Sequence, residues 1–245
     1  MRVSPTELEV FNDCELKHHY RYRMRLKPQD KNPPPNMVSG RVVHRHIQNV
    51  MKLPVDQRKA ALANATLLEQ YLHEEFNGDE DNVKKYLAGV KRATSKVPDW
   101  MLLEVTDWHI EEPITAQVGD IELYGIPDLW YIDDGEGLVP YVCVIDTKTT
   151  DNEPLDFILW NPQLRIYSLM LSQKFPHHNI MYRYLCLPTS EKPAKMSSAH
   201  IFTPNAHLQT TEYITRIGGG IGLYREFGDR MELGPQAREG MHCRY

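Results

Sequence analysis

The sequence predicts an α/β fold in which a central β-sheet is flanked by helices and follows a helical N-terminal layer. Residues 1–99 contain helix-start signals and apolar residues at helical spacing, whereas residues 100–203 are rich in short β-branched runs. The run at 138–145 is apolar almost without interruption, which favours a strand that is buried on both faces. A helical pattern at 161–173 separates this strand from another apolar run at 180–187. Such alternation of strands and helices is typical of α/β proteins.

The composition is that of a soluble globular protein organised as one domain. The chain has 245 residues, of which 41% are hydrophobic and 25% are charged. No apolar run reaches the length of a membrane span, and the N-terminus lacks the hydrophobic segment of a signal peptide, so we expect a cytoplasmic protein without membrane contact. The single domain comprises a helical part, a sheet core that includes the 161–173 helix, and a C-terminal helix with a tail, at residues 1–99, 100–203 and 204–245.

The first predicted helix begins after Ser4. Serine is a good N-cap, Pro5 suits the first helical position, and Glu7 places an acid in the first turn. Residues 27–37 contain four prolines, so we expect an exposed connection there rather than a regular helix.

The second predicted helix begins near residue 39 and runs to Met51, with apolar residues at helical spacing. His44 lies one residue from this apolar stripe, at the edge of the buried face, and we expect its neighbour His46 to face solvent. A histidine placed like His44 is usually a helix residue bonded to a carbonyl group, so only the motifs that follow make it a candidate ligand.

Residues 56–76 and 79–97 predict two further helices, separated by Asn77-Gly78 and ended by Pro98. They carry no chemical motif, and we expect them to form a helical layer beside the sheet.

Strands are predicted next, at 101–110, 114–118 and 121–132, and a tight turn at 133–137 leads into the 138–145 strand. We interpret these strands as a meander that places Asp128 and Asp146 on neighbouring strands.

An acid and a lysine follow the 138–145 strand. Asp146 and Lys148 are two residues apart, and side chains at that spacing in a strand share a face. A carboxylate beside an ammonium group suits phosphodiester hydrolysis, because the acid can hold a divalent metal and the lysine can stabilise charge on phosphate. Asp-x-Lys is also a common tripeptide, and taken alone it is better explained by a surface salt bridge.

The C-terminal part continues the alternation. Asn161 as N-cap and Pro162 at the first position predict the start of a helix, on which Gln163 and Tyr167 share one face. There follow a strand at 180–187, a loop at 188–199, a short strand at 200–202, a helix at 204–228 that three glycines weaken, and an irregular tail at 229–245.

The charge is unevenly distributed along the chain. The net charge is −5, but residues 1–52 contain ten Lys/Arg and five Asp/Glu, a local charge of +5 that leaves −10 for the remainder. Five of the basic residues lie in the segment 17–27, interleaved with tyrosines. Such a segment can bind phosphates while it stacks on bases, and it is equally well explained as the solvated end of an amphipathic helix.

Four short motifs occur in one order along the chain: a histidine on an early helix, Gly-x-Pro-Asp at a strand, Asp-x-Lys at the end of the next strand, and Gln-x-x-x-Tyr on the helix that follows. They correspond to His44, Gly125 to Asp128, Asp146 to Lys148, and Gln163 to Tyr167. In this order the chain resembles PD-(D/E)xK nucleases, in particular the RecB nuclease domain and the CRISPR-associated exonucleases related to it. The likeness extends from Ser4 to about Leu187 and includes the tyrosine-rich opening of the chain.

The resemblance implies a restriction-endonuclease-like central mixed β-sheet and a metal-dependent DNA exonuclease that acts in recombination, repair or DNA processing. It implies Mg²⁺ or Mn²⁺ as cofactor and DNA, single-stranded or with an end, as partner, and it leaves protein partners open. Catalytic roles are implied for Asp128, Asp146 and Lys148. The implied metal ligands are His44, Asp128, Asp146 and the backbone carbonyl of Thr147. Gln163 and Tyr167 would contact DNA near the scissile phosphate, and the basic segment adds Lys17, Arg21, Arg23 and Arg25 as DNA-binding residues.

The cysteines depart from the pattern of many relatives, which bind an iron–sulfur cluster through one cysteine near the N-terminus and three near the C-terminus. Here Cys14 and Cys243 occupy comparable places, and the other two ligands are missing. Cys143 and Cys186 lie in predicted core strands, where buried small hydrophobes are expected. We therefore expect reduced thiols and no complete cluster in this chain.

Two rival functions remain open from the sequence. A catalytically silent DNA-binding module would keep the fold and the basic segment but would not need Asp128, Asp146 and Lys148, all of which this chain retains. A metal-dependent enzyme acting on a small phosphoester would have a closed pocket rather than a channel beside residues 17–27.

Overall fold

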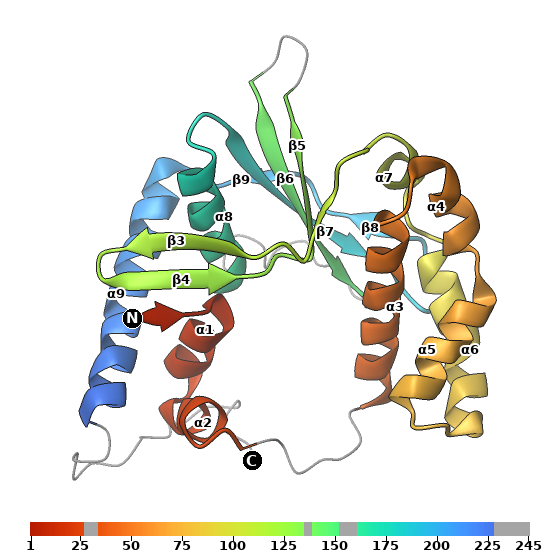
Figure 1. Cartoon of the computed structure of the whole chain (residues 1–245), viewed down its shortest axis with the longest axis horizontal. Helices are drawn as coiled ribbons and strands as arrows, with labels where there is room; N and C mark the ends of the chain where they lie inside the picture. The colour runs from red at the N-terminus through yellow and green to blue at the C-terminus, as the bar shows by residue number, and fades with distance from the viewer. Residues whose placement is uncertain (27–33, 135–138, 152–160, 228–245) are drawn as a thin grey trace.

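The structure, a computed structural model, describes residues 1–26, 34–134, 139–151 and 161–227. Within these residues a six-stranded mixed sheet lies at the centre of the fold (Figure 1). Its strands run in the order β2-β5-β6-β7-β8, and β9 also pairs with β7. Their bounds are β2 (His109–Ile110), β5 (Leu129–Asp133), β6 (Tyr141–Lys148), β7 (Asn179–Cys186), β8 (Lys195–Met196) and β9 (His200–Ile201).

The strand β6 is buried on both faces, as the sequence predicts. Val142 and Val144 belong to one apolar cluster, and Cys143 and Ile145 belong to a second cluster on the opposite face. β6 is antiparallel to β5 and parallel to β7. The parallel connection passes through helix α8 (Pro162–Lys174), so the expected strand, helix and strand are confirmed.

Helices cover both faces of the sheet (Figure 1). One face is covered by α8 together with α1 (Pro5–Asp13) and α9 (Pro204–Phe227). The other face is covered by the helical layer, which consists of α3 (Pro35–Met51), α4 (Val55–Leu62), α5 (Ala65–Glu75), α6 (Glu80–Thr94) and α7 (Asp99–Leu103). Two short elements, α2 (Glu15–His18) and the π-helix η1 (His19–Arg23), follow α1. None of the helices in the described ranges is long and apolar enough to cross a membrane.

A second, three-stranded sheet has the order β1-β4-β3 within the described residues. It consists of β1 (Arg2–Val3), β3 (Ile114–Val118) and β4 (Ile121–Gly125), with β1 parallel to β4 and β3 antiparallel to it. The predicted meander is therefore wrong at one point. The run 121–132 divides after Gly125, before Pro127, so β4 joins the small sheet and β5 joins the large one.

The helix starts at Ser4 and Asn161 are confirmed. The Ser4 hydroxyl accepts a hydrogen bond from the Glu7 amide at 3.1 Å, and Asn161 Oδ1 accepts one from the Leu164 amide at 3.2 Å. Each cap is followed by proline at the first helical position, where a missing N–H costs nothing.

Helix α3 differs from the prediction in two respects. It begins at Pro35, about four residues early, because proline at the first position starts a helix rather than preventing it. His46 is buried, not solvent-facing, and its Nε2 lies 3.1 Å from the Leu62 carbonyl oxygen. The buried stripe of α3 includes Val42 and Val43, so its centre lies about one residue from the expected position.

The remaining helices and strands require three more corrections. The predicted 56–76 helix breaks at Asn64, whose side chain accepts hydrogen bonds from two amides and caps α5. The predicted strand at 101–110 is wrong, because α7 forms after Pro98 and buries Met101 in the helical layer, so that only β2 remains extended. Strand β8 lies within the predicted loop 188–199, and residues 228–245, including the predicted tail, lie outside the described residues.

The glycines of α9 do not interrupt the helix. Two of them lie where neighbouring elements approach closely. A Cβ on Gly218 would lie 2.6 Å from Ile121 Cδ1, and a Cβ on Gly220 would lie 3.1 Å from the Phe11 ring. The run therefore allows α9 to pack closely against β4 and α1.

A buried arginine ties the helical layer together. The Arg58 side chain on α4 is almost fully buried and donates hydrogen bonds to the carbonyl oxygens of Leu53, Val105 and Thr106. It thereby joins the start of α4 to the segment that leads from α7 to β2.

We expect Arg58→Ala to lower the free energy of unfolding by about 2–3 kcal/mol, because three carbonyl groups lose a charged and buried donor. Urea denaturation would measure the change. The neighbouring variant Lys59→Ala is the control, since Lys59 makes only an exposed ion pair with Asp99 and should change the free energy by less than about 1 kcal/mol. Equal effects of the two substitutions would contradict the role of Arg58.

Candidate active site

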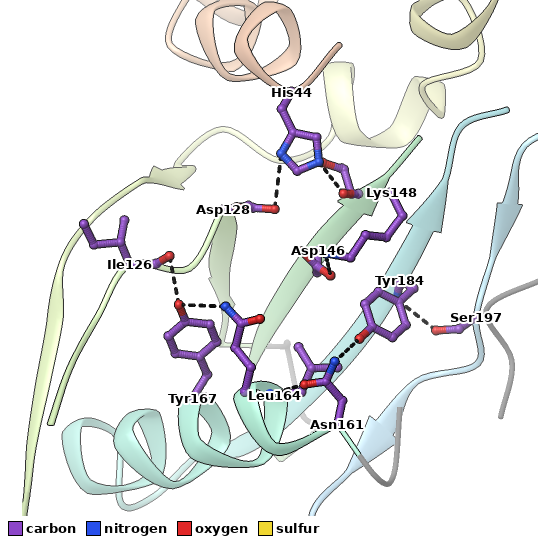
Figure 2. A network of polar contacts seen from close by, with 12 residues as sticks. His44, Ile126, Asp128, Asp146, Lys148, Asn161, Leu164, Tyr167, Tyr184 and Ser197 are labelled. Atoms are coloured by element: carbon purple, nitrogen blue, oxygen red, sulfur yellow. Dashed lines mark hydrogen bonds and ion pairs between the residues drawn. The ribbon is translucent and has the colours of Figure 1, made fainter. Parts of the chain in front are cut away.

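The central sheet brings Asp128 and Asp146 to one place. Asp128 directly precedes β5, and Leu129 of β5 pairs with Ile145 of β6. Asp146 is the residue after Ile145, so the two acids lie beside each other at the end of the antiparallel pair (Figure 2). The two acids are 18 residues apart in the sequence, so the antiparallel pairing of β5 with β6 brings them together.

Asp146 and Lys148 lie on the same face of β6, as their spacing predicts. Lys148 Nζ is 2.8 Å from one Asp146 carboxylate oxygen and 3.1 Å from the other. The ammonium group also lies 5.9 Å from the centre of the Tyr184 ring on β7. The lysine is half-exposed, so it can turn from the acid toward a substrate.

Burial dominates the electrostatics of the two acids. Burial raises the pKa of Asp146 to about 7, a rise that the nearby charge of Asp128 increases and that of Lys148 opposes. Burial likewise raises the pKa of Asp128, although a hydrogen bond with Asp146 and the charge of Lys148 oppose the rise. Asp146 in turn holds the pKa of Lys148 above its usual value despite desolvation. The site thus concentrates negative charge that a cation would stabilise.

His44 reaches the acids from the helical layer. It lies on α3, and its Nδ1 is 3.5 Å from Asp128 Oδ2 (Figure 2). Its Nε2 contacts the backbone carbonyl of Thr147 and lies 2.7 Å from the Thr147 hydroxyl oxygen. Burial lowers the pKa of His44, so the imidazole is neutral at neutral pH, which is the form that binds metals.

The donors around Asp128 fit a hard divalent cation in their chemistry. Asp128 Oδ2 is buried and accepts no hydrogen bond within the described part of the chain. Two carboxylates, the Thr147 carbonyl and one imidazole match the oxygen-rich ligands that Mg²⁺ and Mn²⁺ prefer. Among the described residues, however, no three His, Cys, Asp or Glu side chains already surround one point. Binding would therefore require these side chains to move closer to one point.

Helix α8 supplies the opposite wall of the site. The Tyr167 hydroxyl donates to the Ile126 carbonyl oxygen at 3.2 Å, and Gln163 Nε2 lies 3.4 Å from the same hydroxyl (Figure 2). Gln163 and Tyr167 therefore share a face, as predicted. A pocket separates them from the acids, and it is lined by Ile126, Pro127, Asp128, Val144, Asp146, Gln163, Leu164, Tyr167 and Tyr182.

Gly125 connects two of the sequence motifs. A Cβ at this position would overlap the Tyr167 ring, so the ring packs directly on the glycine backbone. The glycine of the Gly-x-Pro-Asp motif therefore makes room for the tyrosine of the Gln-x-x-x-Tyr motif. In the sequence, Gly125 is recognisable only as a glycine in a predicted strand. Its contact with the Tyr167 ring is revealed by the structure.

Two further side chains support the site and were not predicted from the sequence. Asn161 Nδ2 donates to the Tyr184 hydroxyl at 3.0 Å, in addition to the cap that Asn161 makes on α8. Tyr184 pairs with Asp146 in the β6–β7 ladder, and the Tyr184 amide donates to the Ser197 hydroxyl (Figure 2). The sequence alone could not place Tyr184 beside Asp146, because their adjacency depends on the register in which β7 pairs with β6.

The basic segment lies on α2 and η1 up to Arg23, Arg25 follows η1, and the contacts of its arginines differ. Arg23 donates to the Tyr224 carbonyl oxygen of α9 at 2.8 Å and lies over the Tyr224 ring. Arg21 and Arg25 are exposed, whereas Lys17 is half-buried, and residue 27 lies outside the described range. Arg23 therefore anchors the segment to α9, and the exposed arginines are the better placed for phosphate.

The cysteines fall into two groups. Cys14 is fully buried at the junction of α1 and α2, and Cys243 lies outside the described residues, so their pairing is not described. Cys143 and Cys186 are buried in β6 and β7 as expected, and burial raises the pKa of each thiol to about 11.

The sequence model of the PD-(D/E)XK nuclease superfamily matches residues 2–245. The chain therefore belongs to the PD-(D/E)XK nuclease superfamily, its fold is the predicted restriction-endonuclease-like one, and its class of substrate is nucleic acid. Nucleases of this superfamily generally use divalent metals such as Mg²⁺ or Mn²⁺.

Among solved structures, the protein from Eubacterium rectale named "Putative exonuclease" matches with a TM-score of 0.59 and 10% sequence identity, over 98% of this chain and 85% of that one. At this identity the likeness shows the fold alone. The structure of SSO0001 matches 83% of each chain at 13% identity, but its TM-score of 0.31 is too low to indicate a shared fold. No curated protein matches the chain.

We expect Gly125→Ala to displace the Tyr167 ring, because the added methyl group overlaps it in a packed core. Overpacking of this kind lowers the free energy of unfolding by about 1–3 kcal/mol, and the shifted tyrosine should slow nucleic-acid cleavage. Thermal unfolding and a cleavage assay would measure both effects.

The control is Gly219→Ala. Within the described residues, no atom outside the helix's own backbone lies within 4 Å of a Cβ at that exposed position, so alanine should raise the stability by about 0.5–1 kcal/mol. A Gly125→Ala protein as stable and active as the parent would refute the contact.

Proposed function

We propose that this nuclease is a metal-dependent DNA exonuclease, acting in DNA recombination, repair or processing. The proposal rests above all on one observation, the meeting of Asp128, Asp146 and Lys148 beside a pocket that Gln163 and Tyr167 line. Digestion from an end is supported by the resemblance to RecB-like exonucleases and by the name of the Eubacterium rectale neighbour. The same resemblance supports single-stranded or end-containing DNA as the substrate.

The cofactor in this proposal is Mg²⁺ or Mn²⁺. Asp128, Asp146 and the Thr147 carbonyl would hold it, with His44 as the fourth group. Such an ion supplies an activated water and polarises the phosphate. The ion would also stabilise the ionised form of both carboxylates, which burial disfavours, as the raised pKa of each shows.

Lys148 is assigned to the charge that develops on the phosphate. Its ammonium group is held at Asp146 until substrate arrives, and it is exposed enough to move to a phosphate oxygen. A positioned donor of this kind lowers the energy of the transition state more than that of the substrate.

Gln163 and Tyr167 are assigned to the nucleotide beside the scissile phosphate. Both side chains line the pocket, and the Tyr167 hydroxyl is fixed by its bond to the Ile126 carbonyl oxygen. That bond fixes the position of α8 relative to Asp128, which lies two residues after Ile126.

The variants Asp146→Asn and Lys148→Ala should fail in different ways. Asp146→Asn should abolish Mn²⁺ binding and cleavage, because it removes a carboxylate ligand. Lys148→Ala should keep Mn²⁺ binding but lower the single-turnover rate by about 10²–10³-fold, as expected for a lost transition-state donor. Calorimetry with Mn²⁺ and single-turnover cleavage of end-labelled DNA would separate the two effects.

Thermal unfolding in EDTA at pH 8 supplies the control for folding. The raised pKa of Asp146 means that the carboxylate is ionised at this pH at a cost to the folded state, so Asp146→Asn should unfold at the parent's temperature or a higher one. A Lys148→Ala protein that cleaves at the parent rate would remove the catalytic role of the lysine.

Exposed arginines of the basic segment should set the salt dependence of DNA binding. Replacing Arg21 and Arg25 by alanine should weaken binding to all sequences alike and should reduce the slope of log K against log salt by about 1.4, or 0.7 for each lost contact on single strands. Fluorescence anisotropy at several salt concentrations measures this slope.

Two comparisons make that test specific. Replacing Lys59 and Lys84, exposed lysines of the helical layer, removes the same charge and should leave the slope unchanged. Arg23→Ala should chiefly lower the thermal stability, because it releases the Tyr224 carbonyl group. Equal slopes for the arginine and lysine double variants would exclude the segment as a DNA contact.

A further inference from the structure

Tyr182 lines the pocket of the two acids but is not among the proposed metal-binding or DNA-binding residues. Tyr182 lies on β7 opposite Val144, and its side chain is completely buried. Its hydroxyl oxygen has no hydrogen-bond partner within the described part of the chain. The neighbouring tyrosines differ in this respect, since the Tyr167 hydroxyl bonds to Ile126 and the Tyr184 hydroxyl bonds to Asn161. A buried hydroxyl without a partner is costly, so it calls for a ligand.

The pocket beside Tyr182 has the size and chemistry to hold one water molecule. Tyr182 lines the pocket together with Asp128, Asp146 and Gln163, and the cavity volume is about 20 Å³. A volume of about 10–15 Å³ on this scale suffices for one water, provided that two to four polar groups surround it. The lining residues Tyr182, Gln163, Asp128 and Asp146 carry a hydroxyl, an amide and two carboxyl groups, and Asp128 Oδ2 is itself buried without a hydrogen bond from the described residues.

We propose that Tyr182 is a positioning residue of the metal site, and that it acts through one ordered water between its hydroxyl and the carboxyl groups of Asp128 and Asp146. This inference rests on the proposed function, because it concerns the same acids. The hydroxyl donates to the water, and the water donates one hydrogen to a carboxylate oxygen of each acid. Each acid is then held in one orientation from the sheet side, while His44 and Lys148 hold the pair from the other directions.

This arrangement predicts a measurable contribution to metal affinity. Groups that orient metal-binding carboxylates through hydrogen bonds typically change the affinity 10–100-fold when they are removed. If Tyr182 served only to fill space, phenylalanine would do so equally well. Removing an unsatisfied buried hydroxyl would then stabilise the protein rather than weaken it.

The test is Tyr182→Phe in the full chain, which keeps the ring and removes only the hydroxyl. We expect the dissociation constant for Mn²⁺, measured by calorimetry, to rise at least tenfold. In EDTA we expect the melting temperature to fall by about 2–4 °C, because the water loses one of its partners. A crystal structure of the parent should show a water within hydrogen-bond distance of Tyr182 Oη.

Tyr71→Phe is the matched control. Tyr71 is a buried tyrosine of the helical layer, and its hydroxyl accepts a hydrogen bond from Asn49 at 2.9 Å. Loss of the Tyr71 hydroxyl and of this hydrogen bond should lower the melting temperature and leave the dissociation constant for Mn²⁺ unchanged.

The failures are distinguishable. A Tyr182→Phe protein that binds Mn²⁺ as the parent does, or that melts at the parent's temperature or above it, overturns the role of Tyr182 alone. A parent that binds no Mn²⁺ overturns the proposed metal site. In that case the melting temperature in EDTA and the crystal structure still decide whether the water is present.

Discussion

The structure around the site depends on the partial burial of two carboxyl groups side by side. Asp128 directly precedes β5, Asp146 lies in the neighbouring strand β6, and desolvation raises the pKa of both. Two such groups repel each other when both are ionised, so the fold must offset that repulsion. Lys148 does so from the same strand, and a divalent cation would do so more completely. The cost of the pair in the absence of a cation is therefore the physical basis of its affinity for one.

Each layer of the fold contributes one constraint on this pair. The helical layer provides His44, which contacts Thr147 and approaches Asp128. The α8 layer provides Tyr167, which fixes the Ile126 carbonyl group just before Asp128. Gly125 allows that approach, because any larger residue would overlap the ring. A site assembled from both faces of one sheet is disturbed by a shift of either layer, which explains why its motifs are spread along the chain.

Features set by local rules were predictable from the sequence. The caps at Ser4 and Asn161 depend on three or four adjacent residues, and the shared face of Asp146 and Lys148 follows from the two-residue period of a strand. Features that depend on distant partners were not. The burial of His46 comes from its bond to Leu62, and the pairing of β1 with β4 joins segments more than a hundred residues apart. Propensity carries no information about such partners, because tertiary packing overrides it.

Position on the sheet also explains why the two neighbouring tyrosines of β7 differ. Tyr182 and Tyr184 share one face of β7, two residues apart, and alternate with residues of the opposite face. Tyr184 lies opposite Asp146, near the strand end, where Asn161 reaches its hydroxyl from the start of α8. Tyr182 lies one step deeper, opposite Val144, where apolar side chains of the core surround its ring and the pocket at the acids is its polar boundary. The same residue type thus has a hydrogen-bonded hydroxyl at one register position and, two residues earlier, a buried hydroxyl without a partner among the described residues.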